Sequence, residues 1–202
     1  ILFISDEVIC GFGRTGQLFG SQTLGTEPDL ITFAKAVTNG FQPLGGVLVS
    51  DKVARVITAK GGEFAHGFTY SGHPIACAAA MATLDIMHSE NIFERVREHA
   101  APYLQKRWAE LGEHPIVGHT RGLGMFGSME LVRNKKTRER LAPDQVSGGI
   151  CRDLAMENGL VMRAVGDSMI ISPPLICTHA EIDTLIERAT KALDQTAERF
   201  SV

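Results

Sequence analysis

A short apolar run, Pro28-Asp29-Leu30-Ile31-Thr32-Phe33-Ala34-Lys35, ends in a lysine. Its apolar and β-branched residues lie between Pro28 and the turn signal Asn39-Gly40, which predicts a buried strand of a parallel sheet. A lysine at the carboxyl end of such a strand is expected to be partly desolvated. Desolvation favours the neutral amine, which is the nucleophilic form. Because most lysines are solvated surface residues, Lys35 becomes a candidate only beside a second functional group.

A pair of carboxylates supplies that second group. The apolar run Ile1-Leu2-Phe3-Ile4 is followed at once by Ser5-Asp6-Glu7-Val8. If both runs are parallel strands of one α/β sheet, Asp6 and Lys35 emerge at the same carboxyl edge, where open sheets bind ligands. Pyridoxal phosphate needs a lysine for its Schiff base and a carboxylate to keep its pyridine nitrogen protonated. The pair therefore indicates a site for this cofactor.

Three motifs carry a resemblance to a known family. They are Asp6 to Gly16 (DEVICGFGRTG), Pro28 to Lys35 (PDLITFAK) and Gly67 to Pro74 (GFTYSGHP), in that order. Together they resemble the class III pyridoxal-phosphate aminotransferases of fold type I, and are most similar to the ω-amino acid or diamine:pyruvate branch. The resemblance spans all 202 residues but corresponds to about the C-terminal half of a family member.

The resemblance implies an α/β fold in two parts. Residues 1–105 would be the C-terminal part of the cofactor-binding large domain, a mainly parallel sheet with helices that includes a linking helix. Residues 106–202 would form a small C-terminal α+β domain. The chain begins inside what would be a central strand, so we expect it to be a fragment that is inactive alone.

The resemblance also implies roles for individual residues. Lys35 would be the catalytic lysine that binds the cofactor and shuttles a proton, Asp6 would hold the pyridine nitrogen, and Val8 would pack under the ring. Phe68 and Thr69 would reach across a dimer interface to the phosphate of the partner's cofactor. A homodimer or a dimer of dimers is therefore expected.

One arginine is a candidate for substrate binding. Arg163 interrupts an apolar strand signal, and alternation places it on the same face as Val161 and Val165. Arginines in strands usually lie at exposed edges, yet a guanidinium can also bind a carboxylate through two parallel donors. The segment is similar to the place where the family keeps a mobile arginine for the substrate carboxylate, which implies this role for Arg163.

The implied reaction is transamination of an ω-amino acid, diamine or amine, with pyruvate or another keto acid as acceptor. Two alternatives stay open. The chain could be a truncated, non-catalytic half-domain that serves as an interaction module, or it could share the fold and act as an aminomutase or racemase. Dependence of turnover on pyruvate would separate an aminotransferase from an aminomutase or a racemase.

A glycine-rich motif suggests a further alternative. Gly11-Phe12-Gly13-Arg14-Thr15-Gly16 satisfies the G-x-G-x-x-G pattern of dinucleotide-binding proteins. That pattern requires the glycines to follow a strand immediately and to open an amphipathic helix. Here Asp6 and Glu7 intervene and no helical periodicity follows. We therefore expect a glycine-rich loop that passes close to other backbone segments.

Composition excludes several other classes. A net charge of −3 gives no electrostatic argument for binding nucleic acid or anionic lipid. No apolar run approaches the ~20 residues of a membrane span, so the expected location is the cytoplasm. The four cysteines form no C-x-x-C pair and the seven histidines no H-x-x-x-H spacing, which disfavours disulfides and metal sites.

Periodicity predicts the remaining elements. Helices are expected over about 51–59, from Pro74 onward, from Asn91 to Gly112, over 143–157 and from the capping box at Thr178. A strand is expected over 124–132. The turn signal at 166–168 predicts a hairpin between strands at 160–165 and 169–172.

Overall fold

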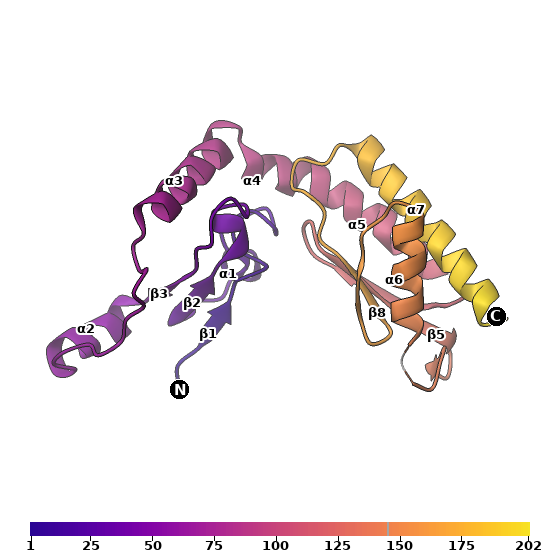
Figure 1. The fold of residues 1–202 in the computed structure, drawn as a ribbon, viewed down its shortest axis with the longest axis horizontal. Helices are drawn as coiled ribbons and strands as arrows, with labels where there is room; N and C mark the ends of the chain where they lie inside the picture. The colour runs from indigo at the N-terminus through magenta and orange to yellow at the C-terminus, as the bar shows by residue number, and fades with distance from the viewer. Residues whose placement is uncertain (145) are drawn as a thin grey trace. The chain divides into compact units, whose positions relative to one another are not determined.

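The computed structural model describes residues 1–144 and 146–202 of the chain. These residues form two compact units, Ile1–Arg95 and Val96–Val202 (Figure 1). Along the sequence, the division between the units falls after Arg95, ten residues before the predicted domain boundary at residue 105. That boundary stays a prediction for the complete protein. Each unit is described by itself below.

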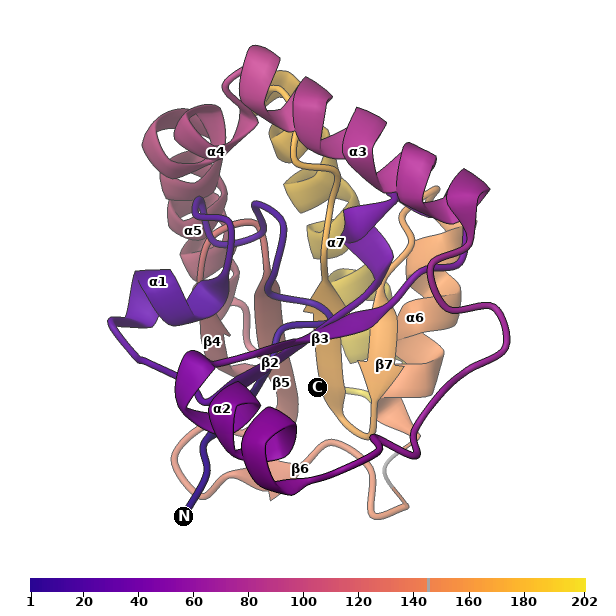
Figure 2. The same cartoon turned by 90° about the vertical axis from the view of Figure 1, so that its left-hand side faces the viewer.

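The first unit contains a three-stranded sheet in the order β1-β2-β3. Its strands are β1 (Ile4–Asp6), β2 (Leu30–Phe33) and β3 (Gly46–Val49). β1 and β2 pair in parallel, with Asp6 opposite Thr32, whereas β2 and β3 are antiparallel. Figure 2 shows β2 and β3 side by side. The parallel pairing that the site requires is therefore present.

The prediction that these strands are buried is wrong within this unit. β2 is half-buried along its whole length, and Ile4 and Asp6 at the two ends of β1 are exposed. The physical reason is that no helix of the described residues packs extensively against the faces of this three-stranded sheet. Lys35 just beyond β2 is also exposed, contrary to the expected desolvation.

The helices of the first unit begin where the sequence indicates. Asp51 opens a helix that ends at a glycine C-cap, and Pro74 occupies the first turn of the long helix that follows the loop, as expected for a residue without an N–H donor. The helical segments are α1 (Gly20–Leu24), the 3₁₀ turn η1 (Lys35–Val37), α2 (Asp51–Lys60), α3 (Pro74–Ser89) and α4 (Ile92–Arg95).

The second unit contains an antiparallel sheet in the order β4-β5-β8-β7, with β6 paired to β5. The hairpin predicted around residues 166–168 is confirmed. β4 was not anticipated, because its sequence Val117 to Gly122 mixes polar residues with glycine. The strands are β4 (Val117–Gly122), β5 (Gly127–Asn134), β6 (Glu139–Arg140), β7 (Arg163–Val165) and β8 (Ser168–Ile171).

Helices pack against this sheet and enclose a core. α5 contacts β4, α6 contacts β7 and β8, and α7 contacts both other helices (Figure 1). Trp108 is 1 % exposed and donates its indole N–H to the Ser128 carbonyl at 3.1 Å. The helical segments are the π-turn η2 (Val96–Ala100), α5 (Ala101–Glu110), the 3₁₀ turn η3 (Leu111–Glu113), α6 (Ser147–Glu157) and α7 (His179–Arg199).

The last helix confirms its predicted start. Thr178 accepts the backbone N–H of Glu181, and the Glu181 carboxylate accepts the backbone N–H of Thr178 at 2.8 Å, so both halves of the capping box are formed. α6 begins at Ser147, later than the predicted position 143, and Gln145 lies outside the described residues.

No helix in the described part of the chain is both long and apolar enough to cross a membrane. Among the same residues, no group of three or more histidine, cysteine or acidic side chains is arranged to hold a metal ion.

Candidate active site

The carboxylate of Asp6 lies at the carboxyl end of β1 and is held from one side. Its Oδ1 atom accepts the backbone N–H of Val8 at 3.2 Å and the hydroxyl of Thr32 at 3.1 Å. Its Oδ2 atom accepts no hydrogen bond from the residues that the structure describes. Asp6 is exposed, so Oδ2 is available to a ligand.

Lys35 follows the end of β2 in an unusual backbone conformation. Its φ of 51° lies in the left-handed region, which costs a residue with a side chain roughly 1–2 kcal/mol. It opens the 3₁₀ turn η1, and its amine makes no hydrogen bond or ion pair within residues 1–144 and 146–202. Such local strain is often found at functional positions.

β1 and β2 bring Asp6 and Lys35 to one edge of the sheet. The two strands run in parallel and Asp6 pairs with Thr32, three residues before Lys35. Both candidate side chains therefore follow the carboxyl ends of adjacent parallel strands, where α/β sheets bind ligands.

Glu7 anchors the segment beside Asp6, a role that sequence reasoning missed. Its side chain is buried, with 2 % of the residue exposed. Oε2 accepts the Gly20 N–H at 2.8 Å, and Oε1 accepts the Ser21 N–H at 2.6 Å and the Ser5 hydroxyl at 3.2 Å. The only sequence signal was a second carboxylate next to Asp6, whose buried partners become visible only when the chain folds back at Gly20.

The glycine-rich motif forms a loop, as expected. The N–H of Gly11 donates to the Glu7 carbonyl at 2.8 Å, and a Cβ at Gly11 would lie only 2.9 Å from that oxygen. The helix that follows, α1, begins at Gly20, beyond the motif. The glycines therefore do not open a helix, and the dinucleotide-binding alternative lacks its structural context.

Two other groups lie close to Asp6 along the chain. Val8, the predicted contact for the cofactor ring, is half-buried. The pKa of the Cys10 thiol is raised, first by desolvation and then by the negative charges of Glu7 and Asp6. The raised pKa keeps the Cys10 thiol protonated at neutral pH, which disfavours it as a nucleophile.

Phe68 and Thr69 lie in the loop between α2 and α3. Both residues are exposed, and Phe68 is 70 % accessible. The Phe68 ring contacts the Tyr70 ring edge to face at 5.8 Å between centroids. The loop thus presents aromatic and hydroxyl groups outward, and their predicted contact with a partner's cofactor stays a prediction.

Arg163 begins β7, an edge strand of the second unit. Val161, Arg163 and Val165 are all exposed while Met162 is buried, which confirms the predicted alternation. The guanidinium of Arg163 has no hydrogen bond or ion pair with the part of the chain that the structure describes. It is therefore free to bind a carboxylate.

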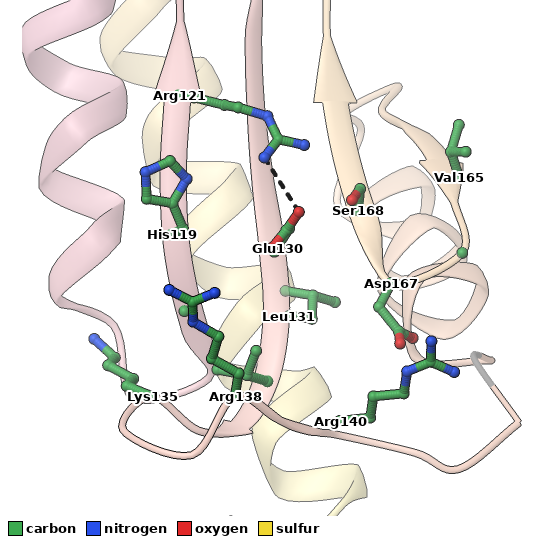
Figure 3. Close-up of a pocket in the computed structure, with 13 residues that line it drawn as sticks. His119, Arg121, Glu130, Leu131, Lys135, Arg138, Arg140, Val165, Asp167 and Ser168 are labelled. Carbon is green, nitrogen blue, oxygen red and sulfur yellow. Dashed lines mark hydrogen bonds and ion pairs between the residues drawn. The ribbon is translucent and has the colours of Figure 1, made fainter.

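A cavity of about 760 Å³ lies on the sheet of the second unit (Figure 3). Arg121, Glu130, Lys135 and Asp167 are among the residues that line it. Arg121 pairs with Glu130 at 3.2 Å, Lys135 donates to the Gly112 carbonyl at 2.7 Å, and Asp167 accepts the Ser147 hydroxyl. These charges are already engaged, and the cavity contains none of the predicted site residues.

Comparison with known proteins identifies the family of this chain. The family model described as aminotransferase class-III matches residues 1–193. The chain therefore belongs to the class III aminotransferase family, and its predicted α/β fold is that of the family's solved structures.

Among curated relatives, it is 58 % identical over 197 residues to a putrescine–pyruvate aminotransferase of Pseudomonas aeruginosa, covering 98 % of this chain and 43 % of that protein. It is 42 % identical over 202 residues to the mitochondrial gamma aminobutyrate transaminase 1 of Solanum lycopersicum, covering 98 % of this chain and 39 % of that protein. The chain thus spans less than half the length of these relatives.

Solved structures show the same relationship. A transaminase with L-Ala has a TM-score of 0.93 at 37 % identity, covering 98 % of this chain and 47 % of that one. An (S)-enantioselective ω-transaminase from Thermomicrobium roseum has a TM-score of 0.91 at 43 % identity, covering 97 % and 44 %.

Proposed function

We propose that this chain is the C-terminal part of a pyridoxal-phosphate-dependent aminotransferase and supplies its catalytic lysine, Lys35. The observation that carries the proposal is the parallel pairing of β1 with β2, which places Asp6 and Lys35 at one sheet edge. Membership of the class III family supports it.

The residues at this edge suit the cofactor. Asp6 keeps Oδ2 without a donor from the described residues, and this oxygen can accept the N–H of a protonated pyridine ring. Lys35 is exposed and its amine is unpaired within the same residues, so it can bind an aldehyde. When bound, pyridoxal phosphate supplies an electrophilic aldehyde and a ring that withdraws electrons.

Each residue then has a defined task. Lys35 would hold the cofactor through its amine, and the same amine would serve as the group that accepts and donates a proton at the substrate. Asp6 would hold the protonated ring nitrogen, and Val8 would contact the ring.

The rest of the site involves a second subunit and the substrate. Thr69 and Phe68 would contact the phosphate of the cofactor in the partner of a homodimer, or of a dimer of dimers. Arg163 would bind the carboxylate of an ω-amino acid or of the keto acid through two parallel hydrogen bonds.

The proposed donors are an ω-amino acid, a diamine or another amine, and the proposed acceptor is pyruvate or another keto acid. The names of two relatives, putrescine–pyruvate aminotransferase and gamma aminobutyrate transaminase, support this range. A small molecule of this kind would be processed in the cytoplasm.

The test is the Lys35→Ala variant of the complete protein. Without the amine, no covalent bond to the cofactor can form, so we expect the visible absorbance of lysine-bound cofactor and the transamination of putrescine with pyruvate to disappear. Lys60→Ala, at the exposed end of α2, is the matched control and should behave as wild type. An unchanged absorbance in Lys35→Ala would refute the assignment.

The two other hypotheses are separated by the same assay. An aminomutase or racemase would turn over its amino acid without pyruvate. A non-catalytic half-domain would show no turnover with any amine, even when the cofactor is supplied.

A further inference from the structure

We propose that Thr32 is a positioning residue that orients the Asp6 carboxylate toward the cofactor ring. The inference rests on the proposed function and deepens it, because it concerns how the ring nitrogen is recognised. It begins from an unequal use of the two oxygens of Asp6.

Both donors to Asp6 converge on one oxygen. The Thr32 hydroxyl donates to Oδ1 at 3.1 Å and the Val8 N–H donates to the same atom at 3.2 Å. Neither group donates a hydrogen bond to Oδ2. The protein therefore holds the carboxylate through Oδ1 and leaves Oδ2 available to a ligand. Rotation of the carboxyl group would break both hydrogen bonds at once.

Thr32 is suited to this task by its place in the sheet. It lies in the middle strand β2, opposite Asp6 on one side and Val47 on the other. Its carbonyl oxygen also accepts the Glu7 N–H at 2.9 Å. A β-branched side chain has few χ1 rotamers, so the Thr32 hydroxyl has little conformational freedom on this paired backbone.

The second donor is fixed independently. Val8 follows Glu7, whose buried carboxylate is tied to the N–H groups of Gly20 and Ser21. The backbone that follows Asp6 is therefore restrained, and among the described residues the Thr32 hydroxyl is the side-chain donor to its carboxylate. Orienting the carboxylate before the cofactor arrives reduces the entropy lost on binding, which strengthens affinity.

The experiment compares Thr32→Val and Thr32→Ser in the complete protein. Valine has nearly the same shape without the hydroxyl, whereas serine keeps it. A hydrogen bond to a charged group makes a larger contribution to free energy than one between neutral groups. We therefore expect Thr32→Val to weaken binding of pyridoxal phosphate to the apoprotein about ten-fold. Thr32→Ser should remain within about two-fold of wild type, because the donor is retained.

A cofactor analogue isolates the role of the ring nitrogen. In 1-deazapyridoxal phosphate, a C–H group replaces the nitrogen, so Asp6 has no N–H to accept. We expect Thr32→Val to bind this analogue within about two-fold of wild type, because the orientation of Asp6 no longer matters. Equal weakening toward both molecules would overturn the proposal, as would unchanged binding of pyridoxal phosphate.

Thr58→Val is the control for losing a threonine hydroxyl. Thr58 lies on α2 and donates to the Ala54 carbonyl at 3.0 Å, one turn back on the same helix. Its affinity for the cofactor should match wild type. If Thr32→Val lowers the melting temperature of the apoprotein more than Thr58→Val does while cofactor affinity is unchanged, Thr32 is structural and the proposal fails.

Failure of this inference differs from failure of the proposed function. If the wild-type protein binds no pyridoxal phosphate, or if Lys35→Ala leaves the absorbance unchanged, the proposed function is wrong. If wild type binds and Lys35→Ala behaves as expected but Thr32→Val has no selective effect, only the role of Thr32 is wrong.

Discussion

The two units of this chain differ in how many of their large apolar side chains are buried. In the second unit, Trp108, Leu104 and Met129 are each 1 % exposed or less. In the first unit, Phe41 and Phe68 are 78 % and 70 % exposed. The second unit encloses most of its large apolar side chains, whereas the first unit presents many of them at its surface.

The closed hydrophobic core and the proposed catalytic residues lie in different units of the chain. The second unit has a core between its sheet and three helices. The first unit contains Asp6 and Lys35, which follow the carboxyl ends of the adjacent strands β1 and β2.

The largest expected effect tests the core of the second unit. Trp108→Ala removes a fully buried ring and its hydrogen bond to Ser128, so we expect it to lower the free energy of unfolding by about 3–5 kcal/mol. Urea unfolding of the 202-residue chain, followed by circular dichroism, measures the change.

Phe68→Ala is the matched change in the first unit. Because its ring is already largely solvated, we expect a loss within about 0.5 kcal/mol in the same experiment. If the two substitutions cost the same, the contrast between the units does not hold.

A pair of neighbouring glycines in α6 gives an intermediate effect. A Cβ at Gly148 would overlap the Gly166 carbonyl oxygen, whereas a Cβ at Gly149 would enter open space. Gly148→Ala should therefore destabilise the chain by about 1–3 kcal/mol, as overpacking does. Gly149→Ala should stabilise it by roughly 0.5–1 kcal/mol through helix propensity. Opposite signs in urea unfolding would confirm the packing of α6 against the β7–β8 turn, and equal signs would contradict it.

The smallest effect concerns a hydrogen bond between α5 and α7. The Tyr103 hydroxyl donates to both oxygens of Asp183, at 2.8 and 2.9 Å, and Arg107 Nε donates to Oδ1 at 2.9 Å. The Tyr103 hydrogen bond, followed by Arg107, lowers the pKa of Asp183 below its ordinary value of 3.8. The folded state thus favours the ionised carboxylate.

The sign of the pH dependence follows. A lowered pKa in the folded state contributes stability above pH 3.8, and this stability is lost as the pH falls through the folded value. Tyr103→Phe should therefore reduce the difference in unfolding free energy between pH 6 and acid pH. Tyr70→Phe, which alters an exposed tyrosine of the first unit, should leave the difference unchanged. Equal slopes in wild type and Tyr103→Phe would contradict the coupling.

Local signals in the sequence predicted much of this fold. Pro74 at a helix start, the capping box of Thr178 with Glu181, and the turn at 166–168 all act between residues close in the chain. Asp6 and Lys35 could be proposed because each follows an apolar run. Their common edge required only that the two runs pair in parallel, which they do.

Contacts between distant residues could not be predicted in this way. β4 has weak strand propensity and is paired only because β5 lies beside it. The hydrogen bond from Tyr103 to Asp183 joins residues eighty positions apart, and no local pattern in the sequence predicts it. The exposure of Lys35 and of both ends of β1 also escaped prediction, since an apolar run does not reveal which elements will cover the faces of its sheet.

By itself, the sequence determined the family, the candidate lysine and carboxylate, and most helix boundaries, because these depend on short motifs and on periodicity. The tertiary structure alone decided that Glu7 is buried against Gly20 and Ser21, and that Thr32 and Val8 share one oxygen of Asp6. These contacts depend on strand register and on a loop folding back, and register is a property of paired strands rather than of either strand alone.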